Sequence, residues 1–466
     1  MLLLHRIMLN FFEPFNILHI FVLIQMKYFR ILLALREFDI CIHTMGKKKK
    51  QKTLEKEELQ LFSKTELIEK IIKLEEENKQ LKAARNKIKE KSKNKDTIRK
   101  SQKPFDFSKC NKRHILLKFY YLGWDYNGFV VQESTDNTIE EHLFEALIKS
   151  CCIESRETSN YHRCGRTDKG VSSFSQVISI DLRSKLNPED QCKLEDELPY
   201  CKILNRLLPS NIRCIAWCPA SSDFSARFNC KFRTYKYFFP RGNLDIDSMD
   251  KAVKYTIGEH DFRNICKMDV ANGVTNYQRK VIDAKVCLYR RDFRNISGYD
   301  LCQLIITSQA FLWHQIRCLM GVLFLIGQGK EKPEIILELL DIEKCPRKPQ
   351  YNLAHEIPLN LWYCEYDTIE WYIDKDELIN TIKLLQRDWT LNTVKSVMIE
   401  NMLSDLEDII DGKDMLSQSD CLLLGIQPRV YQRLMKRPTC ESLESKIKRY
   451  ESKKQKKEDP DNNDDK

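Results

Sequence analysis

The fold of this 466-residue chain is decided by the stretch Arg163-Cys164-Gly165-Arg166-Thr167-Asp168-Lys169-Gly170-Val171. The stretch places the carboxylate of Asp168 in a short loop that is flanked by glycines and crowded by cations. Upstream, Thr138 and Glu141 have the spacing of a capping box and predict the start of a helix that runs to Ser150. Downstream, Val177–Leu182 partly alternates like a strand. We therefore expect Asp168 at the tip of a connection, where rigid elements can present it to a substrate.

By spacing alone, this loop has two interpretations. One is a surface turn with a solvated cluster of charges, and the other is a carboxylate presented for function. A phosphate-binding loop is excluded, because the GxxxxG spacing of Gly165 and Gly170 is followed by Val171 and Ser172, where Lys and Ser/Thr are required.

The segments around the loop mix strands and helices in two series. The first series contains strands at Ile115–Leu122, Val177–Leu182 and Ile212–Trp217, and helices at Glu140–Ser150 and Leu198–Leu208. The second contains strands at Lys231–Phe239, Lys280–Leu288 and Leu301–Ser308, and helices from about Ser248, at Trp313–Gly327 and at Glu334–Leu340. Two halves that each mix strands with returning helices predict an α+β architecture.

Several motifs across this region point to one family. They are Gly165–Ser172 (GRTDKGVS), Phe224–Phe228 (FSARF), Arg233–Tyr237 (RTYKY) and Phe311–Arg317 (FLWHQIR). In this order, within about Ile115 to Tyr366, they resemble the TruA-type tRNA pseudouridine synthases. Phe262–Val270 (FRNICKMDV) resembles the eukaryotic branch of that family, which modifies positions 38 and 39 of the tRNA anticodon arm.

The resemblance implies both a fold and a function. The implied fold has two ferredoxin-like (RRM-like) halves that form a continuous, mainly antiparallel sheet with a central cleft, preceded by a charged N-terminal helix. The implied activity is that of an isomerase that converts uridine to pseudouridine at positions 38 and 39 of the tRNA anticodon stem-loop, with no cofactor and no metal. Alternatives are the same chemistry at other tRNA or small nuclear RNA positions, and a tRNA-binding protein or chaperone without activity. Family members are homodimers, so we expect a homodimer.

Arg317 is the strongest indication of a site that the residues give on their own. On the predicted helix Trp313–Gly327 it shares a face with apolar side chains, where an unpaired buried charge is costly. Either the guanidinium snorkels to the surface or it has a carboxylate partner. The resemblance implies that this partner is Asp168, which a nearby cation would keep ionised.

The resemblance implies that Asp168, Tyr235 and Arg317 are catalytic. Asp168 is the expected nucleophile, because a positioned carboxylate can form a covalent intermediate. Whether it attacks the ribose or the base stays open. Tyr235 lies on a strand whose alternate residues face one way, and its ring could stack on an extruded uracil while its phenol shuttles a proton. From the residues alone, a tyrosine of the core is the better interpretation.

Other side chains are expected to bind the substrate. Arg166 and Arg227 are expected RNA contacts, because arginine serves both phosphates and flipped bases. Phe311 and Leu312 are expected to line the pocket. Lys169 lies close to Asp168 in the sequence, and for it a solvated lysine is the simpler interpretation.

The net charge of +10 is unevenly distributed along the chain. Residues 45–103 hold 20 Lys/Arg against 10 Asp/Glu, an excess as large as the net charge of the whole chain. Attraction to a polyanion is thus concentrated in a leader, and any basic groove in the body must arise by arrangement. We expect these regions: 1–44, a leader or an extension ahead of a natural start at Met45; 45–111, a basic segment with a coiled-coil-like helix; 112–230 and 231–366, the two catalytic halves; and 367–466, a C-terminal extension with a disordered charged tail.

Within the basic segment, Leu67, Leu74, Leu81 and Ile88 fall seven residues apart, which is typical of a coiled coil. The second seam position is mostly polar, so a single charged helix is an equal alternative. Further towards the N-terminus, Pro14–Met26 is apolar but short for a membrane-spanning helix, and we expect no membrane association.

The 18 cysteines show no CxxC pair and no Cys/His set at zinc spacing. Such a scattered set is typical of reduced, buried thiols, and we expect a location in the nucleus and cytoplasm. Cys164 is expected to be a small packing residue rather than a nucleophile.

Overall fold

The computed structural model describes residues 105–190, 193–292, 297–410, 418–426 and 429–458, together with the single residue Glu76. The chain divides into two units, Met1–Lys103 and Pro104–Lys466, and the description below concerns the second. The predicted leader and the predicted coiled-coil seam lie outside the described residues.

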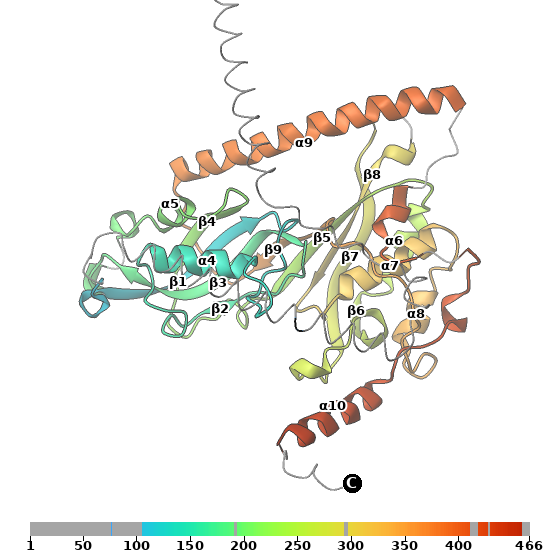
Figure 1. The fold of residues 1–466 in the computed structure, drawn as a ribbon, viewed down its shortest axis with the longest axis horizontal. Helices are drawn as coiled ribbons and strands as arrows, with labels where there is room; N and C mark the ends of the chain where they lie inside the picture. Colours follow the sequence, from blue (N-terminus) through green and yellow to red (C-terminus); the bar gives the residue numbers. More distant parts are fainter. Residues whose placement is uncertain are drawn as a thin grey trace, which may run out of the picture. The chain divides into compact units, whose positions relative to one another are not determined.

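A nine-stranded sheet forms the centre of the second unit (Figure 1). Its strands are β1 (Asn111–Tyr121), β2 (His162–Arg163), β3 (Ser172–Ser184), β4 (Ile212–Pro219), β5 (Phe232–Pro240), β6 (Gly258–Asp261), β7 (Gln278–Arg290), β8 (Leu301–Ser308) and β9 (Leu359–Glu365). The order is β4-β1-β3-β9-β5-β8-β7-β6, with β2 paired to β3. The pairing of β3 with β9 is parallel and the other pairings are antiparallel, so the predicted α+β fold with a mainly antiparallel sheet is confirmed.

Helices accompany both series of strands. They are α4 (Ile139–Lys149), α5 (Tyr200–Asn205), α6 (Ile246–Lys254), α7 (Gln315–Gly327), α8 (Ile335–Leu340), α9 (Lys375–Ile410) and α10 (Leu443–Glu458). Short 3₁₀ turns are η1 (Phe107–Lys109), η2 (Pro188–Asp190), η3 (Leu194–Asp196), η4 (Arg263–Ile265), η5 (Val270–Asn272), η6 (Ser297–Tyr299), η7 (Gln418–Leu422) and η8 (Leu434–Lys436). Within the described residues, no helix has the length and apolar character to cross a membrane.

The first half of the sheet packs against α4 and α5. The side chain of Thr138 accepts a hydrogen bond from the backbone N–H of Glu141 at 3.3 Å, which starts α4 where the sequence predicts it. Phe144 and Leu147 of α4 belong to the same buried cluster as Leu117 of β1 and Ile178 of β3. This packing fixes β3, which follows the Asp168 loop, and its neighbour β1.

The second half packs against α6, α7 and α8. Alternate residues of β5 are buried, so Tyr235 and Tyr237 face the core as the sequence predicts. The prediction of one apolar face on α7 is incomplete, because all 13 residues of this helix are buried. One reason is a further covering segment: a Cβ at Gly321 would lie 2.4 Å from the carbonyl oxygen of Asn352, and the N–H of Ala354 donates to the carbonyl of Arg317.

Strand β9 joins the two halves and is missed by the sequence analysis. It pairs with β5 over Leu359–Glu365, and through Asn360 and Leu361 with Ser172 and Ser173 of β3. A buried central strand with mixed polar and apolar residues gives little periodic signal. Its position makes the sheet continuous at the end of the Asp168 loop.

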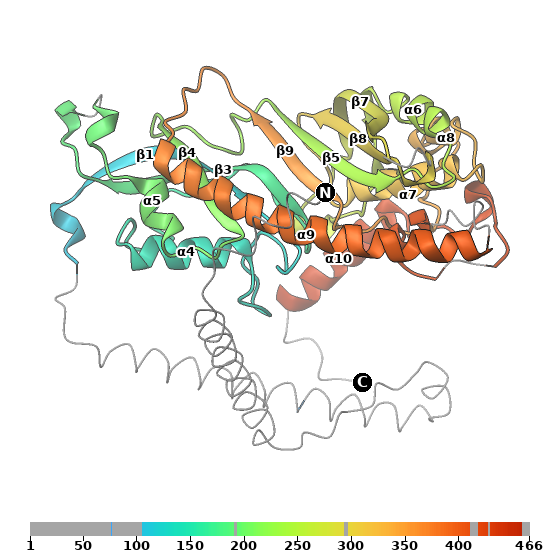
Figure 2. The same cartoon turned by 90° about the horizontal axis from the view of Figure 1, so that it is seen from above.

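The C-terminal extension contains one long helix. Helix α9 runs along both halves of the sheet, as the two views show (Figures 1 and 2). Near its start Glu377 accepts a hydrogen bond from Asn205 of α5 at 2.8 Å, and near its end Glu407 accepts one from Tyr299. The helix therefore connects the two halves outside the sheet.

A further helix lies within the charged tail for which the sequence predicts disorder. Helix α10 covers Leu443–Glu458, and the hydroxyl of Ser442 accepts the N–H of Ser445 at 3.2 Å at its start. Leu443 is buried and Ile447 packs on the core of the second half. These two apolar contacts anchor a helix whose composition alone favours disorder.

Candidate active site

One cavity of about 1310 Å³ lies between the two halves of the sheet. Its volume exceeds that of typical small-molecule pockets of about 300–1,000 Å³. All of the predicted site residues line it, namely Asp168, Tyr235, Arg317, Arg166, Lys169, Arg227, Phe311 and Leu312. The structure thus brings together in space residues that the sequence spreads over 150 positions.

The Asp168 loop connects β2 to β3 and is held from two sides. The carbonyl of Thr167 accepts the N–H of Phe129 at 3.1 Å, and the hydroxyl of Thr167 lies 2.7 Å from that of Tyr121. Gly170 has φ +78, and a Cβ there would lie 2.6 Å from Cγ of Glu356. Glycine at this position therefore permits both the turn and the approach of Glu356 to the site.

Three side chains from the start of α7 surround the carboxylate of Asp168. Trp313 Nε1 donates to Oδ1 at 3.2 Å, while Oδ2 lies 3.4 Å from His314 Nε2 and 4.0 Å from Arg317 Nη1. Burial raises the pKa of Asp168, and the Arg317 charge and the Trp313 hydrogen bond oppose this increase without cancelling it. The charge of Arg317 thus favours the ionised carboxyl, as the sequence indicates, but burial has the larger effect on the pKa.

Arg317 has a closer carboxylate partner than Asp168. Its Nη2 donates to Glu356 Oε2 at 2.6 Å and its Nε donates to the carbonyl of Ala354 at 2.9 Å. The side chain is 6% exposed, which excludes snorkelling. The cation is shared between two carboxylates, and Glu356 makes the short, charge-assisted contact. The ion pair with Asp168 expected from the sequence is thus present only as the longer of two contacts.

His314 is neutral at physiological pH. Burial and the charge of Arg317 lower its pKa to about 3. The residue has φ 58 and ψ 12, a left-handed conformation that is uncommon for a side chain other than glycine and places it at the start of α7. A neutral imidazole can donate or accept a hydrogen bond beside Asp168, but it adds no cation to the site.

Tyr235 lines the cavity from β5 and is 8% exposed. Its ring meets that of Phe311 edge-to-face, with the centroids 5.1 Å apart. Burial raises its pKa well above the usual range, so the phenol keeps its proton. A fixed aromatic ring beside a second ring can support a planar ligand by stacking.

The cavity lining is positive, although the body of the chain is nearly neutral. Eight Lys/Arg line it, against Asp168, Asp269 and Glu356 as the acids. Burial and the charges of Arg163 and Arg227 lower the pKa of Arg166. Such crowded cations favour a polyanionic ligand, and the basic groove arises by arrangement as the sequence indicates.

Four cavity residues with charged or polar contacts to the site are missed by the sequence analysis. Trp313 and His314 stand inside a motif that is quoted for the resemblance, yet no role is predicted for them. Lys267 Nζ lies 4.1 Å from the ring centroid of Trp313. Glu356 belongs to none of the motifs, and its partnership with Arg317 depends on a tertiary contact that no local pattern reveals.

A positive cleft with a half-buried carboxylate is typical of an enzyme that acts on a polyanion. Comparisons with known proteins define this class further. A sequence model of the tRNA pseudouridine synthase family matches residues 252–367. The tRNA pseudouridine(38/39) synthase of Homo sapiens is 46% identical over 417 residues, covering 82% of this chain and 87% of the relative.

More distant relatives agree. The tRNA pseudouridine(38/39) synthase of Saccharomyces cerevisiae is 42% identical over 326 residues, covering 66% of this chain and 72% of the relative. The tRNA pseudouridine synthase A of Methanothrix thermoacetophila is 29% identical over 296 residues, covering 63% of this chain and 98% of the relative. The chain belongs to the TruA-type tRNA pseudouridine synthases, a family of isomerases, and the resemblance drawn from its motifs is confirmed.

Proposed function

We propose that this enzyme converts uridine to pseudouridine at positions 38 and 39 of the tRNA anticodon stem-loop, with Asp168 as the nucleophile. The names of the human and yeast relatives support the two positions. The observation that carries the proposal is the carboxylate of Asp168 within 4.0 Å of Arg317 in a cavity lined by cations. It supplies a nucleophile, a charge partner and a binding surface for RNA in one place.

The reaction is an isomerisation, so atoms and electrons balance within the nucleotide. The bond between uracil N1 and ribose C1′ breaks, the base rotates, and a bond forms between C5 and C1′ while the C5 proton is lost and N1 gains one. In its ionised form Asp168 supplies the electron pair for a transient bond to the nucleotide, and the pair returns to the carboxylate when that bond breaks and the product is released. Tyr235 supports the extruded base and, as a neutral phenol, can donate or relay a proton.

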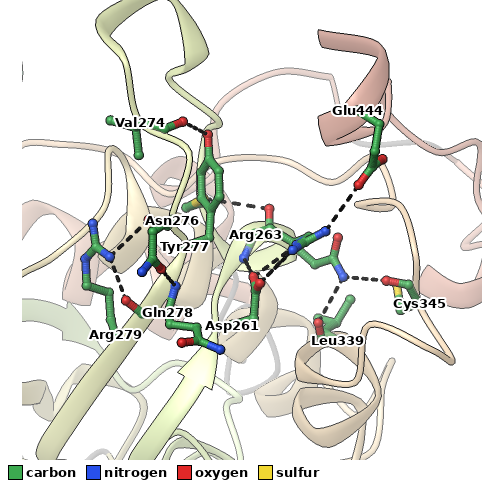
Figure 3. Close-up of polar contacts among 12 residues, drawn as sticks. Asp261, Arg263, Val274, Asn276, Tyr277, Gln278, Arg279, Leu339, Cys345 and Glu444 are labelled. Carbon is green, nitrogen blue, oxygen red and sulfur yellow. Dashed lines mark hydrogen bonds and ion pairs between the residues drawn. The ribbon is translucent and has the colours of Figure 1, made fainter. Parts of the chain in front are cut away.

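We assign the selection of tRNA positions 38 and 39 to the loop that follows β6. This loop contains η4 and η5, and Lys267, Asp269, Asn272 and Tyr277 line the cavity. Figure 3 shows how it is held: Arg263 contacts Asp261 and, at 3.7 Å, Glu444 of α10. Because the loop is fixed to the body of the second half, its position relative to the reacting nucleotide is constant. It can therefore select which nucleotide of the stem-loop is modified.

The test uses the full-length chain and anticodon stem-loop transcripts that carry uridine at position 38, 39, both or neither. Mapping of pseudouridine should show conversion at each of the two positions, and Asp168→Asn should bind the same RNA without converting it. Conversion by Asp168→Asn would contradict the nucleophile. Modification at other positions would favour the sister activity, and binding without conversion by the wild type would favour a tRNA-binding protein or chaperone.

Three further proposals complete the picture. We propose that the chain works as a homodimer, in the nucleus and cytoplasm, and that residues 112–230 and 231–366 are its two catalytic halves. The two buried clusters of the sheet support the division into two catalytic halves. The reduced cysteines throughout the core support the proposed location. Light scattering during gel filtration and imaging of the tagged protein would test the first two.

A further inference from the structure

Three buried cysteines meet at the seam between the two halves. Cys164, Cys230 and Cys364 are 3%, 8% and 5% exposed, and their sulfur atoms all lie within 4.8 Å of one another. Cys164 Sγ lies 3.3 Å from Cys364 Sγ. Each thiol comes from a different segment: the Asp168 loop, the connection between the halves, and β9.

From this geometry we propose that Cys164, Cys230 and Cys364 form a binding site for one thiophilic metal ion, Zn²⁺ in the first place, which clamps the Asp168 loop to the second half of the fold. The site lies outside the catalytic group and goes beyond the proposed function. The sequence spacing shows no such set, because the three cysteines are distant in the chain and converge only through the β3–β9 junction.

The sulfur separations fit a metal better than the alternatives. In a tetrahedral site with Zn–S bonds of about 2.3 Å, neighbouring sulfur atoms are about 3.8 Å apart. The Cys164–Cys364 separation of 3.3 Å is somewhat shorter than this value, and the three sulfur atoms all lie within 4.8 Å of one another. A disulfide needs a sulfur separation of about 2.05 Å, and it would leave the third thiol without a partner.

The charge around the cluster also suits a thiolate site. The guanidinium of Arg233, which is 9% exposed, donates at 2.9 Å to the carbonyls of Cys164 and Arg227. Its hydrogen-bond partners in the described part of the chain are neutral carbonyls. Three thiolates, one divalent cation and one guanidinium together have no net charge. Buried ions are tolerated only when they are compensated in this way.

Binding of Zn²⁺ replaces each S–H bond with an S–Zn bond and releases the proton to water. Cys164 and Cys230 also line the cavity, so a water molecule can reach the fourth position of the ion.

The consequence for the fold is a cross-link close to the site. Cys164 stands four positions before Asp168, and Cys364 pairs in the sheet with Arg233, two positions before Tyr235. An ion that joins them fixes the distance between the two catalytic segments. We expect its removal to lower both the melting temperature and kcat, with little change in tRNA affinity.

The first experiment measures metal in the full-length wild-type chain, purified without chelator, by inductively coupled plasma mass spectrometry. We expect about one equivalent of Zn²⁺ per chain, and a Co²⁺-loaded sample should show the charge-transfer bands of thiolate ligands. Absence of metal together with no saturable Zn²⁺ binding in titration would overturn the proposal. So would peptide mapping that finds a Cys164–Cys364 disulfide in the active protein.

The second experiment uses cysteine variants with a matched control. Cys164→Ala and Cys364→Ala should reduce the bound metal to below about one tenth of an equivalent, whereas Cys218→Ala, a buried cysteine of β4 outside the cluster, should keep it. Metal retained by the first two, or lost from the control, would overturn the assignment. A metal-free wild type prepared with a chelator should melt several degrees lower and recover on addition of Zn²⁺.

Discussion

At the scale of the residue, burial and charge have opposite effects on the carboxyl of Asp168. The carboxyl of Asp168 is desolvated by Trp313, His314 and the loop around it, and the cation that would compensate it is shared with Glu356. Lys267 is the other cation with an electrostatic effect on the carboxyl. The proposed role as nucleophile needs the ionised form that burial disfavours, so the folded state should bear a cost at neutral pH.

This cost predicts that Asp168→Asn stabilises the protein. The pKa of Asp168 is raised above its ordinary value of 3.8, so the carboxyl favours folding fully only below that value and loses this contribution as pH rises through the folded pKa. The melting temperature of Asp168→Asn should therefore exceed that of the wild type at pH 7.5, by a gap that narrows towards pH 4. Calorimetry at several pH values measures the gap, with the exposed Asp125→Asn as the control. A gap independent of pH would contradict the raised pKa.

Glu356 is predicted to act on the reaction through Arg317. Glu356→Gln removes the charge that holds Arg317 at 2.6 Å and that raises the pKa of Asp168. We expect kcat to fall roughly tenfold, a loss of about 1.4 kcal/mol of transition-state stabilisation, with tRNA affinity unchanged. The acidic limb of the profile of kcat/KM against pH should move to lower pH, because one negative neighbour of Asp168 is gone.

The control for this prediction is Glu331→Gln. Glu331 is a buried carboxylate, whereas Glu356 is partly exposed, and the partners of Glu331 are Tyr431, Arg433 and the N–H of Leu434. Its loss should lower stability and leave the acidic limb in place. An unmoved limb in Glu356→Gln, or an equal shift in both variants, would exclude the positioning role.

Sequence motifs predict the cavity residues well, because the residues with the expected chemical roles belong to the motifs. Asp168, Tyr235 and Arg317 stand at motif positions, and all three line one cavity. Lys267 stands inside the motif Phe262–Val270 but has no predicted role, and Glu356 reaches the cavity through a tertiary contact that no local pattern contains. The sign of the pKa shift of Asp168 depends on how burial and charge compare, and that comparison needs coordinates.

At the scale of the element, the agreement follows the strength of each local signal. Strand β8 is predicted to its end residues, and α4 begins at its predicted cap. Strand β9 is missed, because its neighbours on both sides determine it rather than its own alternation. Helix α10 is missed for a related reason, since Leu443 buries against the second half and offsets an unfavourable composition.

Helix α7 is predicted to depend on one close contact. A Cβ at Gly321 would lie 2.4 Å from the carbonyl oxygen of Asn352, in the segment that presents Ala354 and Glu356 to Arg317. Backbone cannot yield as a side chain can, so Gly321→Ala should cost about 1–3 kcal/mol of unfolding free energy. It should also lower kcat, because the displaced segment carries the partners of Arg317. Chemical denaturation and single-turnover kinetics measure the two effects.

Gly327→Ala on the same helix is the matched comparison. There the new Cβ would meet the sulfur of Met249 at 2.7 Å, the flexible end of a side chain that can move aside. We expect a smaller loss of stability and an unchanged kcat. If both variants lost kcat equally, the effect would belong to the helix as a whole and not to the contact with Asn352.

At the scale of the whole molecule, charge and chemistry occupy different parts of the chain. The described body holds the sheet, the cavity and helix α9, which is hydrogen-bonded at one end to Asn205 and at the other to Tyr299. Eight Lys/Arg line the cavity, whereas residues 45–103 carry an excess of positive charge as large as that of the entire chain. This division suggests that general attraction to RNA and selection of the nucleotide are separable.

Deletion of residues 45–103 should separate the general attraction to RNA from the selection of the nucleotide. Each lost phosphate contact reduces the slope of log K against log salt by about 0.7–0.9, so the truncated chain should bind tRNA more weakly and with a flatter salt dependence. Its kcat at saturating tRNA should be unchanged, because the cavity is intact.

A variant with a neutral Gly/Ser segment of equal length separates loss of charge from loss of reach. Arg227→Ala provides the contrast, since a cavity contact should change the slope by at most about one unit. If the truncated chain had the same slope of log K against log salt as the full-length chain, the phosphate contacts would lie in the body. This result would refute the separation of general RNA attraction from nucleotide selection.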